Sequence, residues 1–402
     1  MFNSGVNIWS DYWQNYNNVQ NNVVSQVDAA ILKMSGSMIG MVPSGMVLLT
    51  SVALAVAALK LARKKVLVRE LPCIEMLARV DTLCLDKTGT ITDGSMTVEQ
   101  IIPLGGSEDE IKTYIATVLD ATGDDNMTAK ALKNFIGETV SLDTTAHVPF
   151  SSARKYSAAS VKGHGTIAIG AAEFMFKKAG KEFNAKCNAL LKQGLRVLAV
   201  GRSKKAITAN GTVDGLEPIA IVALSDTIRS DAPEIIKWFR ENNVAIKVIS
   251  GDNPLSVSVI AGKVGVQDAD KYVSLDGMSD EEVLEAANKY TVFGRVTPEQ
   301  KALLVRAMKA EGHTVAMTGD GVNDILAMRE SDCAISVGCG TDAAKTVANL
   351  VLMDNKFSQM PKVVAEGRQV VNNIQNSSSL FLMKTTMTVL TTILCLILRK
   401  DY

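Results

Sequence analysis

A charge-free stretch of 24 residues, 36–59, constrains the fold of this chain more than any other feature. A membrane-spanning helix needs about 20 predominantly apolar residues, and a helix satisfies the backbone polar groups of such a segment in lipid. The stretch therefore predicts a transmembrane helix over residues 34–60. Pro43 and Gly45 would interrupt this helix, which either leaves a simple kink or frees backbone carbonyls for an ion site.

Basic residues lie mostly on one side of this predicted helix. Residues 1–32 contain none, whereas five follow the helix closely: Lys60, Arg63, Lys64, Lys65 and Arg69. The positive-inside bias then places the chain after the helix in the cytosol and residues 1–33 outside, as a polar segment. The aromatic residues of that segment either mark the membrane interface or belong to a poorly ordered terminus.

A second apolar segment, residues 380–398, follows a predicted stalk over 356–379. It carries Lys384, for which snorkelling to the interface is favoured over a role in an ion site. Two such segments predict a multi-pass protein of the cell membrane whose large central part is cytosolic, with the lipid bilayer as one partner.

The central part alternates between strand-like and helix-like segments. Over residues 223–355 this alternation predicts an α/β fold with a doubly wound parallel sheet. Residues 61–99 would hold a stalk and the first part of that domain, because a strand-like run ends at Asp86. Residues 100–222 read as an inserted α/β domain, with helices expected near 108–120 and 128–140.

The overall composition excludes two classes of protein. Lys+Arg and Asp+Glu both number 42, so no basic field exists to collect nucleic acid, and we expect none as a partner. The six cysteines are scattered without a C-x-x-C pair, and the three histidines are isolated. A disulfide framework or a zinc site is therefore not expected, and a reducing compartment fits best.

Asp86 is the residue on which the functional prediction depends. A carboxylate at the end of a buried strand lies where open α/β sheets place their active sites. There it can attack a phosphoryl group and form an acyl phosphate. Thr88 can hold the transferred phosphate and Mg²⁺, and Gly89 allows a close turn.

Further polar groups follow other predicted strands and helices. Ser250, Gly251 and Asp252 end a second strand and can bind phosphate oxygens, and Lys301 supplies a positive charge at the start of a helix. After a third strand, Asp320 and Asp324 can bind or support Mg²⁺, and Asn323 offers an amide to the phosphate. Together these groups are what phosphoryl transfer requires.

Four motifs in this order resemble the signature set of P-type ATPases, in the haloacid dehalogenase superfamily: DKTGTIT at 86–92, SGDN at 250–253, TPEQK at 297–301 and TGDGVND at 318–324. The resemblance covers residues 36–398 and leans toward bacterial cation pumps near the calcium pumps. It implies ATP-driven transport of calcium or another metal cation through an aspartyl phosphate, with ATP and Mg²⁺ as cofactors. The implied catalytic residues are Asp86, Lys87, Thr88, Lys301 and Asp320, and the implied metal ligands are Asp86, Thr88, Asp320 and Asp324.

Residues 100–222 resemble the nucleotide-binding domain of the same family. In the run 150–155 (FSSARK), Phe150 would stack on adenine and Arg154 would contact ATP; Arg196 would meet the phosphates. Asp226 and Arg229 match the motif that bridges the two domains. The family pattern K-G-A-x-E is present with Gly170 but without its lysine, because Ile169 occupies that place, which predicts weaker or differently arranged ATP binding.

The first membrane helix departs from the family pattern Pro-Glu-Gly-Leu. This chain has Pro43, then Ser44 where the family has a carboxylate. The ion-pathway candidates are therefore Pro43, Ser44 and the backbone carbonyls around Val42. Because the carboxylate is missing, a calcium site of high charge is not expected.

Two further departures bear on turnover. The related phosphatases have Asp-x-Asp, whose second aspartate is a general acid/base, but Thr88 stands in that place here. The acyl phosphate should therefore persist, as in an energy transducer rather than a phosphatase. The Thr-Gly-Glu of the family's actuator domain does not occur. We interpret the chain as an internal piece of a pump whose phosphoenzyme decays slowly; the alternatives are a non-catalytic fragment that binds the missing pump half, and a phosphatase.

Overall fold

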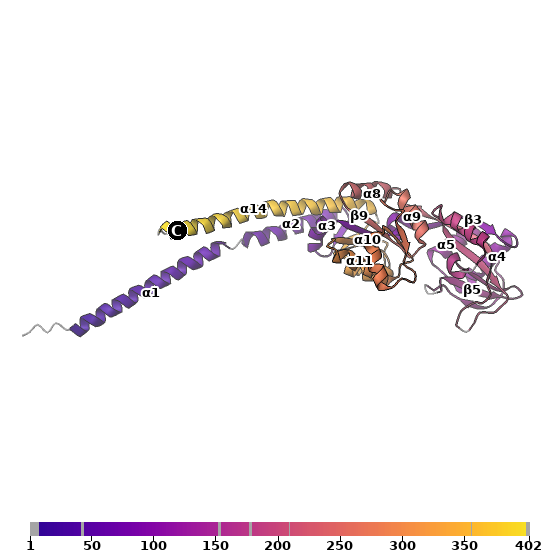
Figure 1. The fold of residues 1–402 in the computed structure, drawn as a ribbon, viewed down its shortest axis with the longest axis horizontal. Coiled ribbons are helices and arrows are strands. Elements are labelled where there is room, and N and C mark those ends of the chain that lie inside the picture. The colour runs from indigo at the N-terminus through magenta and orange to yellow at the C-terminus, as the bar shows by residue number, and fades with distance from the viewer. Residues whose placement is uncertain are drawn as a thin grey trace, which may run out of the picture. The chain divides into compact units, whose positions relative to one another are not determined.

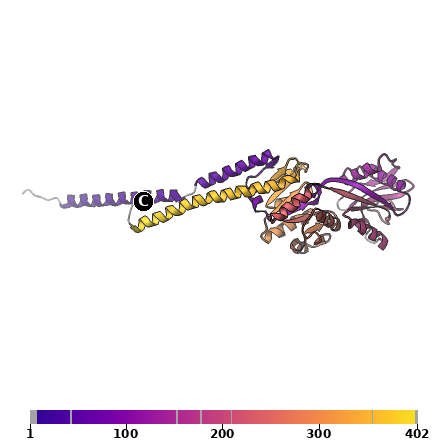
Figure 2. The same cartoon turned by 90° about the horizontal axis from the view of Figure 1, so that it is seen from above.

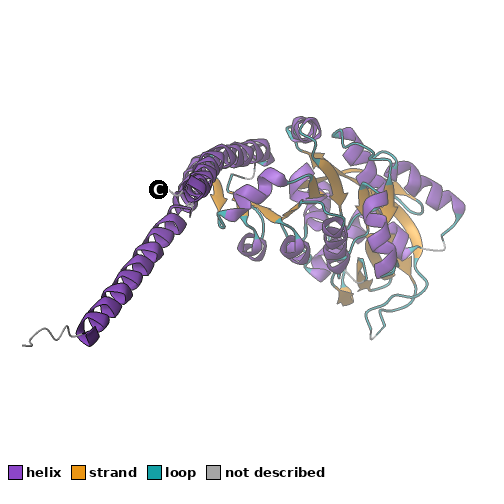
Figure 3. Cartoon of the chain, turned by 60° about the vertical axis from the view of Figure 1, so that its left-hand side comes forward, coloured by secondary structure: helices purple, strands orange, loops and turns teal. Residues whose placement is uncertain are grey.

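The computed structural model describes residues 8–41, 44–151, 154–176, 179–208, 210–354 and 356–398. The chain divides into two compact units. The larger comprises Ala58–Arg368, and the smaller comprises Met1–Ala57 with Gln369–Tyr402. The larger unit contains two β-sheets whose strands lie between helices (Figures 1 and 3).

The first sheet has eight strands in the order β1-β14-β13-β12-β2-β9-β11-β10. Every neighbouring pair is parallel except β1 with β14. This confirms the predicted doubly wound α/β fold. The strands are β1 (Val66–Val68), β2 (Thr82–Asp86), β9 (Ala245–Ile249), β10 (Tyr272–Ser274), β11 (Val292–Gly294), β12 (Val315–Gly319), β13 (Cys333–Val337) and β14 (Leu350–Leu352).

Helices cover both faces of this sheet. One core joins Cys84, Ile249 and Met317 of the sheet to helices α10 and α11, whereas α8 and α9 lie on the opposite face (Figure 1). Because both faces are covered, a central strand such as β2 is buried along its whole length. The helices are α3 (Pro72–Arg79), α8 (Ala232–Glu241), α9 (Pro254–Lys263), α10 (Asp280–Lys289), α11 (Pro298–Ala310), α12 (Ile325–Glu330) and α13 (Asp342–Val347).

The second sheet has six antiparallel strands in the order β3-β8-β7-β6-β5-β4. The chain enters it through β3 and leaves it through β8, which pair with each other from Thr92 and Ile228 onward. Helices α4 and α5 cover one face, and α6 and α7 cover the other. The strands are β3 (Thr92–Pro103), β4 (Thr144–Val148), β5 (Tyr156–Val161), β6 (Gly165–Ala171), β7 (Arg196–Ser203) and β8 (Glu217–Ile228); the helices are α4 (Glu108–Thr122), α5 (Met127–Ile136), α6 (Ala172–Met175) and α7 (Lys181–Leu191).

The local sequence explains where several of these helices begin and end. Helix α11 starts with a capping box between Thr297 and Gln300, with a proline in its first turn. Helix α5 is shorter than the predicted 128–140 because Gly137, at φ +63°, ends it. A glycine with this positive φ stops the helix at Ile136.

Three long helices complete the chain (Figures 1 and 2): α1 (Ile8–Met41), α2 (Ser44–Arg63) and α14 (Met360–Leu398). Two segments of the described chain are long and apolar enough to span a membrane, Gly45–Arg63 and Phe357–Cys395. Residues 8–33 belong to α1, so a poorly ordered terminus is the wrong interpretation for them. No Pro or Gly interrupts that segment.

Candidate active site

The carboxylate of Asp86 lies at the carboxyl end of β2, in the middle of the eight-stranded sheet. Strand β2 pairs with β9 on one side and with β12 on the other, so the strand order reverses here. Ligand sites of open α/β sheets form at such a reversal. The loops that follow β9 and β12 therefore meet the loop that follows Asp86.

Lys301 brings a cation to this carboxylate from the first turn of α11. Its Nζ lies 3.0 Å from Oδ1 of Asp86 and 2.6 Å from Oδ1 of Asp324. All three side chains are buried: the whole residues are 5%, 8% and 2% exposed in that order. Charge-assisted hydrogen bonds of this kind are the stronger class, so the ammonium holds the two carboxylates in place.

A third carboxylate, Asp320, completes the cluster. Ligand oxygens of Asp86, Asp320 and Asp324 all lie within 4.8 Å of one another. Asp324 is fixed further because its Oδ2 accepts hydrogen bonds from the backbone N–H groups of Asp320 (3.3 Å) and Gly321 (3.2 Å). Carboxylate oxygens are the ligands that Mg²⁺ takes from proteins, so this donor set fits that ion.

Gly89 allows the loop after β2, the turn Lys87–Ile91 (η1), to approach Asp320. Its φ is +74°, a left-handed conformation that costs a side chain about 1–2 kcal/mol. A Cβ at this position would also collide with Oδ2 of Asp320. Glycine is therefore required here both for the backbone conformation and for the space.

The cluster carries an excess of negative charge, because one lysine faces three carboxylates. Burial raises the pKa of Asp86 to about 7, the attraction of Lys301 opposes the rise, and Asp324 and Asp320 add to it. Burial and Asp324 likewise raise the pKa of Asp320 to about 6. Burial alone would lower the pKa of Lys301, but Asp86 and Asp324 overcome this and raise it. Burial is the largest cause of the two raised carboxyl pKa values, the repulsion among the carboxylates adds to it, and a bound cation would oppose both.

The model of the haloacid dehalogenase-like hydrolases matches residues 80–332 of this chain. The chain belongs to this family. The match starts just before β2 and extends past β12, so it includes both strands that carry the carboxylate cluster.

Relatives of the chain within this family are cation-transporting ATPases by name. A probable cation-transporting ATPase of Streptococcus pneumoniae serotype 4 is 40% identical over 373 residues, which cover 92% of this chain and 47% of that protein. A calcium-transporting ATPase of Mycolicibacterium smegmatis is 41% identical over 365 residues, covering 91% of this chain and 46% of that protein. The chain thus spans about half the length of the curated relatives it matches.

A solved structure of the same kind is similar in fold. The crystal structure of a zinc-transporting PIB-type ATPase in its E2.Pi state matches with a TM-score of 0.58 and 26% sequence identity. The match covers 88% of this chain and 51% of that one. Together with the relatives, it confirms the predicted resemblance to P-type cation-transporting ATPases.

Several residues predicted for phosphate or ATP binding are held in a chain of ion pairs beside the cluster. The buried ammonium of Lys87 pairs with Asp226 and lies 2.6 Å from Oδ2 of Asp252. The other oxygen of Asp252 pairs with Arg196. Burial lowers the pKa of Lys87, although Asp226 opposes it. Lys87 therefore links two aspartates of the haloacid dehalogenase-like domain in this conformation, instead of pairing with Asp86.

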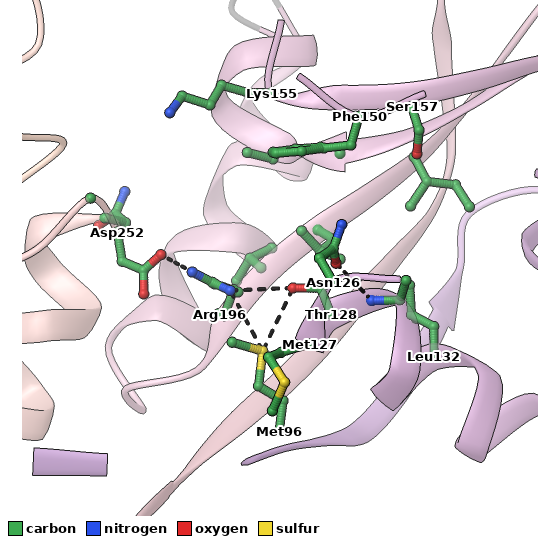
Figure 4. A pocket seen from close by; sticks show the side chains of 18 of the residues that line it. Met96, Asn126, Met127, Thr128, Leu132, Phe150, Lys155, Ser157, Arg196 and Asp252 are labelled. Carbon is green, nitrogen blue, oxygen red and sulfur yellow. Dashed lines mark hydrogen bonds and ion pairs between the residues drawn. The ribbon is translucent and has the colours of Figure 1, made fainter. Parts of the chain in front are cut away.

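A cavity of about 390 Å³ lies between the two sheets of the larger unit (Figure 4). One end is apolar, and the other carries Lys155, Arg196 and Asp252. The cavity reaches the loops that follow β2 and β9, because Thr88 and Gly251 also line it. In Figure 4 the ring of Phe150 lies on one side, and Asn126, Met127 and Thr128 lie on the other. Such a cavity has the form of a nucleotide site, with a stacking surface at one end and cations at the other.

Other predicted residues take different positions. Arg154 does not line this cavity; it donates a hydrogen bond from Nη2 to the carbonyl of Pro149 (3.1 Å). Gly170 lines it, and a Cβ there would collide with the backbone of Lys155 and Tyr156 in the neighbouring strand. Arg229 donates to the carbonyl of Gly89 at 3.0 Å.

Three more predicted residues complete this comparison. Ser250 is buried, and its Oγ accepts a hydrogen bond from the N–H of Asp252 (3.2 Å). Asn323 is exposed on the turn Val322–Asp324 (η2) after β12. Val42 and Pro43 lie outside the described residues, and Ser44 is the first residue of α2.

Sequence reasoning missed a second set of contacts between the two sheets. Glu173, at the start of α6, pairs with Arg295 and accepts a hydrogen bond from Asn253. The guanidinium of Arg295 also lies over the ring of Phe174, with Cζ 4.9 Å from the ring centroid. The backbone of Arg295 has φ +55°, which no local pattern predicted. Glu173 was visible as the last residue of the G-A-x-E pattern, but its partners come from distant segments.

Proposed function

We propose that this chain is the ATP-dependent phosphorylation core of a P-type cation pump, in which Asp86 takes the terminal phosphoryl group of ATP. The observation that carries the proposal is the buried cluster itself. A nucleophilic carboxylate, a lysine 3.0 Å away and two further carboxylates lie together at a strand reversal. The names of the relatives, which are cation-transporting or calcium-transporting ATPases, support the same activity.

The carboxylates of Asp86, Asp320 and Asp324 would hold Mg²⁺, with the hydroxyl of Thr88 as a further candidate ligand. When bound, the ion neutralises charge on the phosphate oxygens during transfer. It would also oppose the burial and the repulsion by Asp324 and Asp320 that together raise the pKa of Asp86 to about 7. An ionised Asp86, the form required for attack, is thereby favoured near neutral pH.

The residues of the chain have separate tasks in this proposal. An oxygen of Asp86 attacks the terminal phosphorus of ATP, a bond to phosphorus forms, and the bond to the bridging oxygen of ADP breaks. Lys301 holds Asp86 in position and faces the charge that develops during transfer. Phe150 stacks on the base, and Lys155 and Arg196 face the phosphates from the charged end of the cavity. Residues 61–99 with 223–355 would form the phosphorylation domain, and residues 100–222 the nucleotide-binding domain.

The transport step belongs to the helices. Residues 34–60 and 380–398 would cross the cell membrane, joined to the cytosolic domains by residues 61–99 and the stalk 356–379. The proposed cargo is a metal cation, and calcium is the ion in the name of the Mycolicibacterium relative. Val42, Pro43 and Ser44 remain the proposed contribution of the first membrane helix to the ion pathway.

Phosphorylation from γ-labelled ATP tests this proposal. The chain should take up label only with Mg²⁺, and the label should be stable in acid and removed by hydroxylamine, as expected for an acyl phosphate. The Asp86→Asn variant should take up none. Label that is equal in this variant, or that survives hydroxylamine, would exclude Asp86 as the acceptor.

A further inference from the structure

A second cavity, of about 280 Å³, lies at the opposite edge of the eight-stranded sheet. It opens beside Ala245, the first residue of β9, and beside Thr291, the residue just before β11. Asp86 lies at the other end of the sheet, paired with Ile249 at the far end of β9. Four residue steps of about 3.3 Å each separate the two ends of β9, so this cavity is distinct from the catalytic cluster.

The walls of this cavity are strongly basic. Its charged lining residues are four cations and one acid: Arg240, Lys247, Lys271, Lys289 and Asp268. The acid is already paired, because Oδ2 of Asp268 lies 3.2 Å from Nζ of Lys271. Lys289 pairs with Glu285, which does not line the cavity. Arg240, at the end of α8, makes no ion pair within the part of the chain that the structure describes.

Lys247 gives this cavity a half-buried cation. The residue comes from β9, and its Nζ donates to the carbonyls of Ala287 (3.1 Å) and Tyr290 (2.6 Å) at the end of α10. An ammonium has three donors, so one is left. Burial lowers the pKa of Lys247 and the charge of Lys271 lowers it further, whereas Cys84 and the charge of Asp268 oppose this. Among the described residues no carboxylate forms an ion pair with Lys247, so an anion in the cavity would stabilise its charge.

We propose that this cavity is a binding site for a phosphate group, carried either by inorganic phosphate or by the headgroup of an anionic phospholipid. The planar guanidinium of Arg240 suits two oxygens of such a group, and lysines serve as point charges around it. A nucleotide is not the expected ligand, because no aromatic side chain lines the cavity for a base to stack on.

The two sources of phosphate both have structural support. Free phosphate would be released when the aspartyl phosphate of the proposed function is hydrolysed, so this source depends on that function. A lipid headgroup is a candidate because α14, which contains a candidate membrane span, contacts this same corner of the unit. Nη1 of Arg368 in α14 donates to Oδ1 of Asn242, two residues after Arg240 (3.1 Å).

Equilibrium binding of labelled inorganic phosphate to the intact chain, in detergent with EDTA, tests the proposal. Without a divalent cation the carboxylates of Asp86, Asp320 and Asp324 repel phosphate, and any phosphate held by Lys155 and Arg196 in the first cavity should be unaffected by a change at Arg240. Wild type should therefore show a phosphate site that Arg240→Gln weakens about tenfold, as expected for a lost charged hydrogen bond. The matched control is Arg306→Gln, which removes an exposed arginine paired with Glu330, outside the cavity.

The outcomes separate clearly. If Arg306→Gln weakens phosphate binding as much as Arg240→Gln does, the effect is a general one of charge and the proposed site is wrong. The proposed site is also wrong if wild type does not bind phosphate. Arg240 is exposed, so its variant should fold, which circular dichroism checks. Lys271→Gln is the second variant, and it should weaken binding further because it leaves Asp268 unpaired.

Nanodiscs then decide between the two sources of phosphate. The chain is placed in phosphatidylcholine discs with or without phosphatidylglycerol, and phosphate binding is measured again. If the headgroup is the ligand, phosphatidylglycerol should displace free phosphate from wild type. If free phosphate is the ligand, both kinds of disc should bind it equally.

Discussion

The ammonium of Lys301 lies 3.0 Å from Oδ1 of Asp86 and 2.6 Å from Oδ1 of Asp324. One buried cation thus contacts two carboxylates at the same time. This arrangement holds the side chain of Asp86, the proposed nucleophile, in position. Among the three described carboxylates of the cluster, Asp320 is the one that forms no ion pair with Lys301. The predictions below start from this geometry.

Replacement of Lys301 by methionine should slow phosphoenzyme formation about 10²- to 10³-fold, the usual loss when one electrostatic contact to a developing charge is removed. Asp86 would also lose the contact that holds it. The measurement is the rate of label uptake from γ-labelled ATP. Lys309→Met on the same helix is the control, because Nζ of Lys309 pairs with Asp332 outside the cluster. Equal rates for Lys301→Met and wild type would exclude a catalytic role for Lys301.

The stability of the metal-free chain should depend on the proton of Asp86. Its pKa is about 7 in the folded chain, against an ordinary value of 3.8. A pKa that is raised on folding contributes stability at low pH that is lost as pH rises through the folded value. The Asp86→Asn variant has no such proton to lose. The melting temperature of Asp86→Asn minus that of wild type should therefore become more positive as pH rises from about 4 to about 7.

Melting curves in EDTA at several pH values measure this difference. Mg²⁺ should reduce it, because a bound cation balances the charge that the proton balanced. Asp214→Asn removes an exposed carboxylate outside the cluster and serves as the control. A melting-temperature difference for Asp86→Asn that stays constant from pH 4 to pH 7 would contradict the raised pKa.

Gly89→Ala should abolish phosphorylation, whereas Gly94→Ala should not. Both glycines have positive φ, +74° and +86°, so each alanine costs about 1–2 kcal/mol in stability. A Cβ at residue 89 would collide with Asp320, but a Cβ at residue 94 would meet no atom within 4 Å. The two variants therefore share the backbone cost and differ only in the collision. If label uptake falls equally in both, the contact with Asp320 is not the cause.

Phe150→Ala should weaken ATP binding by about tenfold or more, because stacking of a base on an aromatic ring contributes about 1–3 kcal/mol. Calorimetry with Mg²⁺ and ATP measures the affinity. Phe135→Ala is the control, since Phe135 is similarly exposed but does not line the cavity. Phosphorylation by a small donor without a base, such as acetyl phosphate, should be unchanged in Phe150→Ala. A loss with both donors would point to a folding defect instead.

The order of motifs along the sequence was sufficient to predict a doubly wound parallel sheet and the members of the carboxylate cluster. Strand β2 is apolar and short, ends at a carboxylate, and belongs to a regular alternation of strands and helices. Parallel strands bring their carboxyl ends to one edge, so Asp86, Asp320 and Lys301 had to lie near each other if the alternation held. Such a prediction needs only the residues at each strand end and the regular alternation of strands and helices.

The partners of the longer charged side chains could not be predicted in this way. Lys87 follows Asp86 directly, yet its ammonium is paired with Asp226 and Asp252 from two distant segments. Arg295 adopts a left-handed backbone, and its side chain contacts Glu173 in the other sheet.

The sequence by itself determined the alternation of strands and helices over residues 223–355 and the position of Asp86 at a strand end, because hydrophobic periodicity and strand ends are local properties. Only the tertiary structure decided which cation pairs with which acid, and where the second basic cavity forms. Those pairings depend on distances between segments that are far apart in the chain, and on the burial that their packing creates.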